Sequence, residues 1–242
     1  MTVRIAMWSG PRNISTALMR SFEARGDCAV SDEPLYGHYL NHTGLDHPGA
    51  DEVMASQATD WRVVVDELVG SPPAGQAIWY QKHMAHHLLD SMDRSWMAKL
   101  RHCLLIRRPE SVLSSYLRTR GSATEDDLGF ARQLEILDYA RDFLGQEPIV
   151  IDSRDVLMAP EKLLRRLCEA LGIPFTEAML RWAPGPRDTD GVWAKYWYEK
   201  VEASSGFAPY KPTEVVIPVE FQPVLSAVQP MYERLYASRL QP

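Results

Sequence analysis

Short apolar runs, each bounded by polar or turn-forming residues, recur along the chain with helix-period stretches between them. Runs of this length are typical of buried parallel strands, and the sequence predicts strands at Val3–Trp8, Ala77–Gln81, Cys103–Ile106 and Pro148–Ile151, with Cys28–Ser31 as a further candidate. Apolar positions three and four residues apart predict helices at Ile14–Arg25, Thr59–Val69, Ser111–Arg120, Asp126–Leu144 and Pro160–Leu171. This alternation indicates an α/β fold: a mostly parallel central sheet of about five strands with helices on both faces.

We expect residues 1–242 to form a single domain. A chain of 242 residues is long enough for one large α/β domain and short for two. Prolines are expected to break the helical pattern of the C-terminal stretch Glu220–Leu240. Two segments lack both the strand and the helix periodicity: residues 37–58, rich in glycine, histidine, aspartate and proline, and residues 184–218, rich in glycine, proline and aromatic residues. We expect irregular loops there that bind substrate.

The charge and the cysteine content of the chain indicate what kind of ligand it binds and in which compartment it occurs. The 26 basic and 32 acidic residues give a net charge of −6, which excludes a surface built to neutralise nucleic acid and favours a small polar ligand in a locally basic pocket. Three widely spaced cysteines without a CxxC pair favour free thiols in a reducing compartment. Since no leader and no bilayer-spanning run is apparent, we expect a cytoplasmic protein without a membrane span.

A turn-rich segment, Gly10-Pro11-Arg12-Asn13-Ile14-Ser15-Thr16, joins the first predicted strand to the first predicted helix. The first turn of a helix leaves backbone N–H groups unpaired and carries a partial positive charge, so this segment is suited to binding an anion. It lacks the Gly-Lys of the common phosphate-binding loop. The alternative is that Ser15 and Thr16 only satisfy the helix end and that Arg12 is a surface charge.

A second segment repeats the order of apolar strand, basic turn and helix start. Arg107 and Arg108 end the predicted strand, Pro109 begins the helix, and Ser115 follows two turns later. A helix brings residues four apart onto one face, so Ser111 and Ser115 align, and Arg107 at the tip of the preceding strand can reach the same side. An arginine and a serine placed together form a clamp for a phosphate.

These two segments, in this order, resemble the sulfotransferases that use 3'-phosphoadenosine 5'-phosphosulfate (PAPS). The first loop of that family commonly has Pro-Lys/Arg-Ser-Gly-Thr-Ser/Thr, and this chain matches at Pro11, Arg12 and both hydroxyls but has Asn13 and Ile14 in place of Ser and Gly. The family's second motif has an Arg, a Pro two residues later and a Ser eight residues after the Arg, as Arg107, Pro109 and Ser115 have here.

A third stretch, residues 148–175, is similar to the late strand and packing helix of the same family. The resemblance therefore extends over roughly residues 3–175, is weak beyond them, and is to a divergent bacterial-type member. It implies the P-loop-like α/β fold of these enzymes, a PAPS donor, a small-molecule acceptor and in-line sulfuryl transfer to a hydroxyl or amine, with no metal ion.

The resemblance also implies roles for individual residues. Arg12, Ser15, Thr16, the amides of the first loop and Lys82 would hold the 5'-phosphosulfate, while Arg107 and Ser115 would bind the 3'-phosphate. Glu33 occupies the place of a proposed base in some bacterial members, with His83 and His86 as further candidates for the base. Met84 stands where the family often has its histidine. From the late aromatic segment, Arg187 and Trp193 are the candidates for closing the nucleotide site.

Two other functions remain open from the sequence. A small-molecule kinase, or another nucleotide-dependent P-loop enzyme, would use residues 10–16 as a degenerate phosphate loop and Asp152 for magnesium. A non-catalytic nucleotide-binding module is the other alternative.

Two histidine pairs, His83 with His87 and His38 with His42, have the spacing of metal ligands on a helix. No HExxH arrangement accompanies them, and we expect no bound metal.

Overall fold

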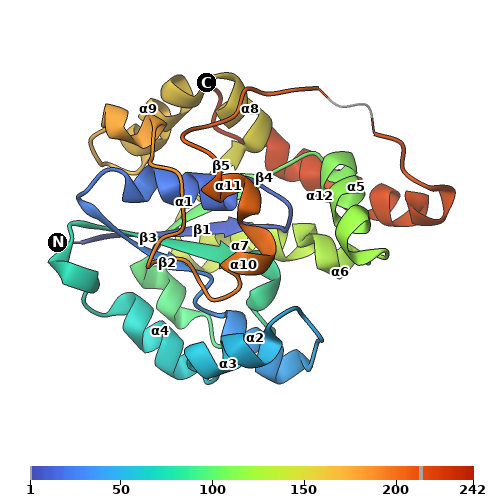
Figure 1. Cartoon of the computed structure of the whole chain (residues 1–242), viewed down its shortest axis with the longest axis horizontal. Helices are drawn as coiled ribbons and strands as arrows, with labels where there is room; N and C mark the ends of the chain where they lie inside the picture. Colours follow the sequence, from blue (N-terminus) through green and yellow to red (C-terminus); the bar gives the residue numbers. More distant parts are fainter. Residues whose placement is uncertain (1, 213–214) are drawn as a thin grey trace.

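The computed structural model describes residues 2–212 and 215–242, and within them five parallel strands form one sheet in the order β2-β3-β1-β4-β5 (Figure 1). The strands are β1 (Val3–Ser9), β2 (Cys28–Asp32), β3 (Ile78–Met84), β4 (Arg101–Ile106) and β5 (Ile149–Asp152). The predicted α/β class and all five predicted strands are confirmed. Because the strands are parallel, the chain turns that follow them lie along one edge of the sheet.

Helices connect the strands and cover both faces of the sheet, as the alternation predicted. They are α1 (Ser15–Glu23), α2 (Tyr36–Thr43), α3 (Ala50–Ser56), α4 (Trp61–Val69), α5 (Pro109–Arg120), α6 (Glu125–Leu128), α7 (Phe130–Leu144), α8 (Ser153–Met158), α9 (Pro160–Ala170), α10 (Ala194–Trp197), α11 (Glu199–Glu202) and α12 (Gln222–Ala237). Short 3₁₀ helices lie at Pro73–Gly75, Ala85–His87, Ser95–Lys99, Glu177–Leu180 and Val219–Phe221.

Alternate residues of each strand enter two separate hydrophobic cores. Met7 and Tyr80 face the core under α1, α8 and α9, whereas Trp8 and Trp79 face the core under α4, α7 and α12. A third, smaller cluster packs α2 and α3 against residues 193–198. The sheet is therefore buried on both faces, and polar side chains for a site are available at its edge.

Two predictions about helices were wrong. The helix expected over Asp126–Leu144 is divided at Gly129, whose φ of +76° ends α6, and a capping box of Thr124 and Asp127 begins the short α6. The prolines at 223 and 230 do not break α12: the first lies in its opening turn, and the helix continues past the second to Ala237.

The two predicted loops are more ordered than expected. Residues 37–58 contain most of α2 and all of α3, and residues 184–218 contain the one-turn helices α10 and α11. Within the second segment, residues 213–214 lie outside the described residues. No helix in the described part of the chain is long and apolar enough to cross a membrane.

Candidate active site

A cavity of about 520 Å³ opens at the carboxyl edge of the sheet, over the ends of β2, β3 and β4. Although the chain is acidic overall, more basic than acidic residues line the cavity. The acidic residues are Glu33 and Asp127, and the basic residues are Arg12, Lys82, Arg107, Arg118, Arg120 and Lys200. The predicted site residues Pro11, Asn13, Ile14, Ser15, Thr16, His86, Ser115 and Trp193 also line it. A broader hollow of about 980 Å³ beside α9 contains none of the predicted site residues.

The loop before α1 is held in shape by its own side chains. Asn13 donates a hydrogen bond from Nδ2 to the Leu105 carbonyl (3.1 Å) and accepts one at Oδ1 from the Ile14 amide (2.8 Å). The first hydrogen bond of the helix runs from the Leu18 amide to the Ile14 carbonyl (3.0 Å). The amides of residues 15–17 therefore precede the first helical hydrogen bond, and all three residues line the cavity.

Gly10 is required by close packing rather than by a special dihedral angle. A Cβ atom at this position would lie 2.4 Å from the Leu128 carbonyl oxygen at the end of α6. Arg12, two residues later, has φ +57°, a conformation that residues with a side chain rarely adopt. The loop is thus clamped against α6 and turned so that the Arg12 side chain points toward α5.

Arg12 meets the second motif directly. Its Nε donates a hydrogen bond to Ser115 Oγ (3.0 Å), and Arg107 donates one to the Arg12 carbonyl. Burial and then the charge of Arg118 lower the pKa of the Arg12 guanidinium. For Arg107, burial and then the charges of Arg12 and Arg118 lower the pKa. Arg118 donates a hydrogen bond to the neighbouring Ser114 (3.0 Å), so three guanidinium groups lie near one another at this end of the cavity, an arrangement suited to an anion.

Arg118 was missed by the sequence reasoning. It is three residues beyond Ser115 on α5, a spacing that places both on one helix face, and this was the available signal. The placement of Arg12 also differs from the expectation, because its side chain lies with Arg107 and Ser115 rather than beside Lys82.

Lys82 is buried in a polar network at the ends of β2 and β3. It pairs in register with Asp32, so the two side chains project from neighbouring strands on the same face. Its Nζ donates to Asp32 Oδ1 (2.8 Å), Glu33 Oε1 (2.5 Å) and the Tyr198 hydroxyl (2.7 Å). An ammonium group has three hydrogens, so all of them are engaged. Although burial opposes the charged form, Asp32 and Glu33 hold the pKa of Lys82 well above its usual value.

Glu33 is the acidic residue of this network that reaches the cavity. Its backbone is in the left-handed region, with φ +42°, and its amide donates to the Lys82 carbonyl (2.9 Å). Burial raises the pKa of its carboxyl group, the Lys82 charge opposes that rise, and Asp32 adds to it. The strained backbone therefore presents a carboxylate of raised basicity to the cavity.

The two histidines considered as bases have different locations. His83 follows Lys82 in β3, so its side chain points to the other face of the sheet, where it stacks on Trp8 with ring centroids 4.3 Å apart. Burial lowers the pKa of His83 to about 3, and the residue does not line the cavity. His86 does line it, and burial lowers its pKa to about 4.

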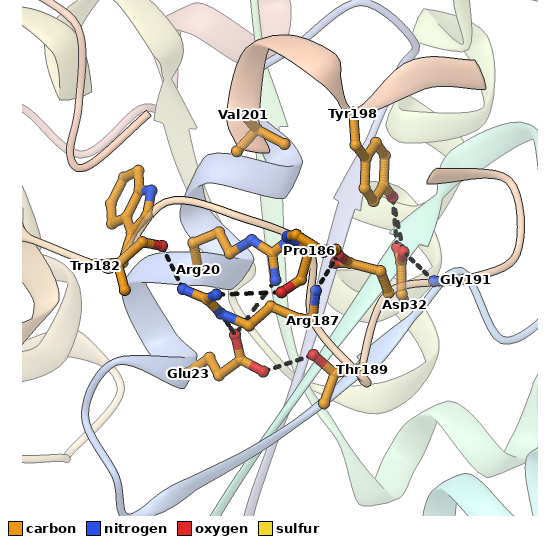
Figure 2. A network of polar contacts seen from close by, with 12 residues as sticks. Arg20, Glu23, Asp32, Trp182, Pro186, Arg187, Thr189, Gly191, Tyr198 and Val201 are labelled. Carbon is orange, nitrogen blue, oxygen red and sulfur yellow. Dashed lines mark hydrogen bonds and ion pairs between the residues drawn. The ribbon is translucent and has the colours of Figure 1, made fainter. Parts of the chain in front are cut away.

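The late segment around Arg187 is anchored to α1 and to Asp32 (Figure 2). Arg187 lies 3.4 Å from Glu23, Thr189 donates to the same carboxylate (2.5 Å), and the Gly191 amide donates to Asp32 (3.1 Å). Asp190 of this segment pairs with the buried guanidinium of Arg20 at 2.5 Å. Arg187 therefore fastens the loop outside the cavity and is not among its lining residues.

Trp193 and Tyr198 form part of the cavity wall. The Trp193 indole donates from Nε1 to the Tyr198 hydroxyl (3.2 Å), and that hydroxyl donates to the Asp32 carboxylate, 2.7 Å from Oδ2. Any side chain at Gly191 would overlap the Trp193 ring, since a Cβ there would lie 2.1 Å from it. Neither Asp32 nor Tyr198 was predicted as a site residue, because their contact joins positions 166 residues apart.

The magnesium and metal interpretations gain no support from the geometry. Asp152 accepts hydrogen bonds from the Arg154 amide (2.7 Å) and the Tyr232 hydroxyl (3.0 Å), is buried, and is not among the residues that line the cavity. In the described residues, no group of three or more His, Cys, Asp or Glu side chains is placed to share a metal ion. His38 instead contacts the Thr59 carbonyl through Nδ1 (2.9 Å).

Comparison with solved structures shows the fold alone. The sulfotransferase domain from the curacin biosynthetic pathway has a TM-score of 0.54 at 15% identity, with 100% of this chain and 99% of that chain covered. The sulfotransferase domain of the Synechococcus PCC 7002 olefin synthase has a TM-score of 0.53 at 18% identity, with 96% and 95% covered. A sulfotransferase from Alicyclobacillus acidocaldarius has a TM-score of 0.54 at 13% identity, with 98% and 95% covered.

Two curated Arabidopsis thaliana proteins are similar in sequence. The chain is 34% identical over 232 residues to branched-chain-amino-acid aminotransferase-like protein 2 and 37% identical over 235 residues to protein 1 of the same name. Each alignment covers 96% of this chain but 41% of the plant protein, so the chain spans about two fifths of their length.

A family model described as a sulfotransferase domain matches residues 3–239. The match extends well beyond the region in which the sequence motifs were found and includes the segment that carries Trp193 and Tyr198. The chain belongs to the sulfotransferase domain family.

Proposed function

We propose that the chain transfers a sulfuryl group from PAPS to a hydroxyl or amine of a small-molecule acceptor. The observation that carries this proposal is the convergence of two anion sites in one cavity: the first amides of α1, and the cluster of Arg12, Arg107 and Ser115. Two such sites suit a nucleotide with phosphate groups at both the 3' and 5' positions. Membership of the sulfotransferase family supports the reaction class.

The donor would lie along the loop before α1. The amides and hydroxyls of Ser15 and Thr16 are suited to the 5'-phosphosulfate, since a helix N-terminus binds anions through free N–H groups and its dipole. Arg12, Arg107 and Ser115 would hold the 3'-phosphate, with Arg118 as a fourth ligand. Asn13 would act indirectly by fixing the loop to β4.

The chemical step needs positioning and a base rather than a covalent protein intermediate. The acceptor oxygen or nitrogen would attack sulfur in line, and the bond from sulfur to the 5'-phosphate oxygen would break. The electron pair of that bond would leave with 3'-phosphoadenosine 5'-phosphate. We assign Glu33 to accept the acceptor proton, and Lys82, held by Asp32 and Tyr198, to position Glu33.

A thermal-shift panel tests the donor. 3'-Phosphoadenosine 5'-phosphate should stabilise the protein without metal, because a ligand well above its Kd raises the apparent stability by several kcal/mol. Stabilisation only by ATP with magnesium would contradict the proposal and favour a kinase. Transfer of labelled sulfate to an acceptor panel then separates an enzyme from a module that binds the nucleotide without catalysis.

A further inference from the structure

One end of the cavity is walled by aromatic and imidazole rings, and we call it the aromatic chamber. Its walls are Tyr36, Tyr39, His86, His87, Trp193 and Trp197. The Tyr36 and His87 rings are stacked 4.8 Å apart, Tyr39 stacks on His87 at 4.6 Å, and Trp193 meets Tyr36 edge-on at 5.2 Å. These contacts fix the rings in place, so the chamber is a rigid, largely aromatic wall of the cavity.

The imidazole groups of the chamber are uncharged near neutral pH. Burial lowers the pKa of His86 to about 4 and holds that of His87 well below its usual value. Among the described residues, the Nδ1 atoms of both rings are buried without a hydrogen-bond partner, and the whole of His87 is 2% exposed. Buried polar atoms without a partner carry a desolvation cost that a polar group on a bound ligand relieves.

Arg120 supplies the charge of this end of the cavity. It ends α5, lines the cavity, and its guanidinium lies over the Trp197 ring, 5.7 Å from the centroid. In residues 2–212 and 215–242, its guanidinium makes no ion pair with a carboxylate. Asp127, the acidic residue on the same wall, binds the Thr124 amide (2.8 Å) and hydroxyl (2.7 Å) instead.

Arg120 is separate from the arginine cluster assigned to the nucleotide. The charge of Arg118, not that of Arg120, acts on Arg12 and Arg107. The Arg120 charge acts instead to lower the pKa values of Tyr36 and Tyr39 in the chamber and of His47. His47 Nδ1 shares a hydrogen bond of 2.8 Å with the Tyr36 hydroxyl. Tyr36 also lies close enough to Glu33 to sense its charge, so the chamber adjoins the assigned base.

We propose that the aromatic chamber binds a hydroxylated aromatic carboxylate as the sulfate acceptor, with its carboxylate on Arg120 and its hydroxyl directed to Glu33. Flat neutral walls match an aromatic body, and a guanidinium without a counter-ion matches a carboxylate, which it binds through two parallel hydrogen bonds. The transfer step of this proposal rests on the proposed function, whereas the charge preference of the chamber does not.

Isothermal titration with three phenols of similar size tests the preference: 3-(4-hydroxyphenyl)propanoate, 4-propylphenol and tyramine. Each is titrated with and without saturating 3'-phosphoadenosine 5'-phosphate. The propanoate should bind the unmodified protein at least about tenfold more tightly than 4-propylphenol, as expected for a charge-assisted hydrogen bond. Arg120→Gln should remove this ratio, and Arg120→Glu should reverse the order of the propanoate and tyramine. Arg62→Gln, an exposed arginine on α4 with 69% side-chain exposure, is the control and should keep the ratio.

Equal affinities for the three phenols, no binding of any of them, or a ratio unchanged in Arg120→Gln would overturn the acceptor assignment. The reversal in Arg120→Glu guards against a loss caused only by misfolding. Lack of binding by 3'-phosphoadenosine 5'-phosphate would instead overturn the proposed function, and the titrations without nucleotide still decide the charge preference.

Discussion

Arg12 Nε donates a hydrogen bond of 3.0 Å to Ser115 Oγ, which joins the loop before α1 to the second turn of α5. The two residues are 103 positions apart, and each belongs to a different motif of the sequence. The hydroxyl of Ser115 therefore orients a guanidinium from the other motif, and the two motifs form one basic cluster.

This contact predicts non-additive effects on nucleotide affinity. Arg12→Ala and Ser115→Ala should each weaken the binding of 3'-phosphoadenosine 5'-phosphate. Comparison of the two single variants with the double variant should give a coupling free energy of about 0.5–3 kcal/mol, the range for residues in contact. Titration calorimetry measures the cycle, with Ser111→Ala on α5 as a control. Affinity for adenosine 5'-monophosphate, which lacks the 3'-phosphate, should change less. Additive losses that are equal for both nucleotides would refute a shared 3'-phosphate site.

Glu33→Gln should lower kcat by about 10²–10⁴-fold, the usual contribution of a general base. The amide keeps the size of the side chain and its contact with Lys82 but takes no proton from the acceptor. Single-turnover transfer of labelled sulfate measures the loss, and calorimetry with 3'-phosphoadenosine 5'-phosphate checks that the nucleotide still binds. Glu67→Gln on α4 is the matched control. If Glu33→Gln kept normal turnover, the base would have to be another residue.

Tyr198→Phe should destabilise the protein by about 1–3 kcal/mol, because the buried Lys82, Asp32 and the Trp193 indole each lose a hydrogen-bond partner. Urea unfolding measures the free-energy difference. Tyr196→Phe provides the comparison, since that ring is 41% exposed. Equal stability of the two variants would show that the hydroxyl of Tyr198 adds nothing to the network.

His102 predicts a specific loss of stability in acid. Its Nδ1 accepts from the Trp8 indole (3.1 Å), its Nε2 contacts the Met97 carbonyl (3.0 Å), and burial lowers its pKa to about 4. Between pH 6.5 and about 4 the unfolded chain takes up a proton at this residue and the folded chain does not. Stability should therefore fall as the pH falls through this window, by about 1.4 kcal/mol per unit from this residue.

Urea unfolding at several pH values, compared between the unmodified protein and His102→Gln, isolates this contribution. The variant should show a shallower loss because glutamine does not titrate. His42→Gln, an exposed histidine on α2, should follow the unmodified protein. Identical acid dependence in His102→Gln would contradict the assignment.

The sheet and the first loop were predictable because their signals are local. Apolar runs such as 3–8 and 103–106 are bounded by turn residues, and the free donors of a helix N-terminus follow from helix geometry alone. The sequence could also have predicted that His83 and Lys82 point to opposite faces of the sheet, had the predicted strand been extended to include them. The predicted strand ended at Gln81, whereas β3 continues to Met84, and adjacent residues in a strand point to opposite faces.

The contacts of Tyr198 and Arg187 could not be predicted in the same way. Tyr198 reaches Asp32 and Lys82 across 166 and 116 positions, and no periodicity in the sequence encodes such pairings. A basic residue near a tryptophan is equally compatible with a nucleotide site and with the anchor that Arg187 forms at Glu23. Only the three-dimensional path of the segment distinguishes these.

The path of residues 187–198 along α1 to the ends of β2 and β3 also sets an order of assembly. All five strands precede Gly172, whereas the hydroxyl that engages Asp32 and Lys82 and the helix α12 that covers one face of the sheet come from the last fifth of the chain. During synthesis from the N-terminus, Lys82 and Asp32 therefore lack their hydrogen bonds with the Tyr198 hydroxyl until Tyr198 has been made. A chain truncated before this segment would therefore keep all five strands but lose both the hydroxyl that completes the Lys82 network and the α12 residues that cover one of the two hydrophobic cores.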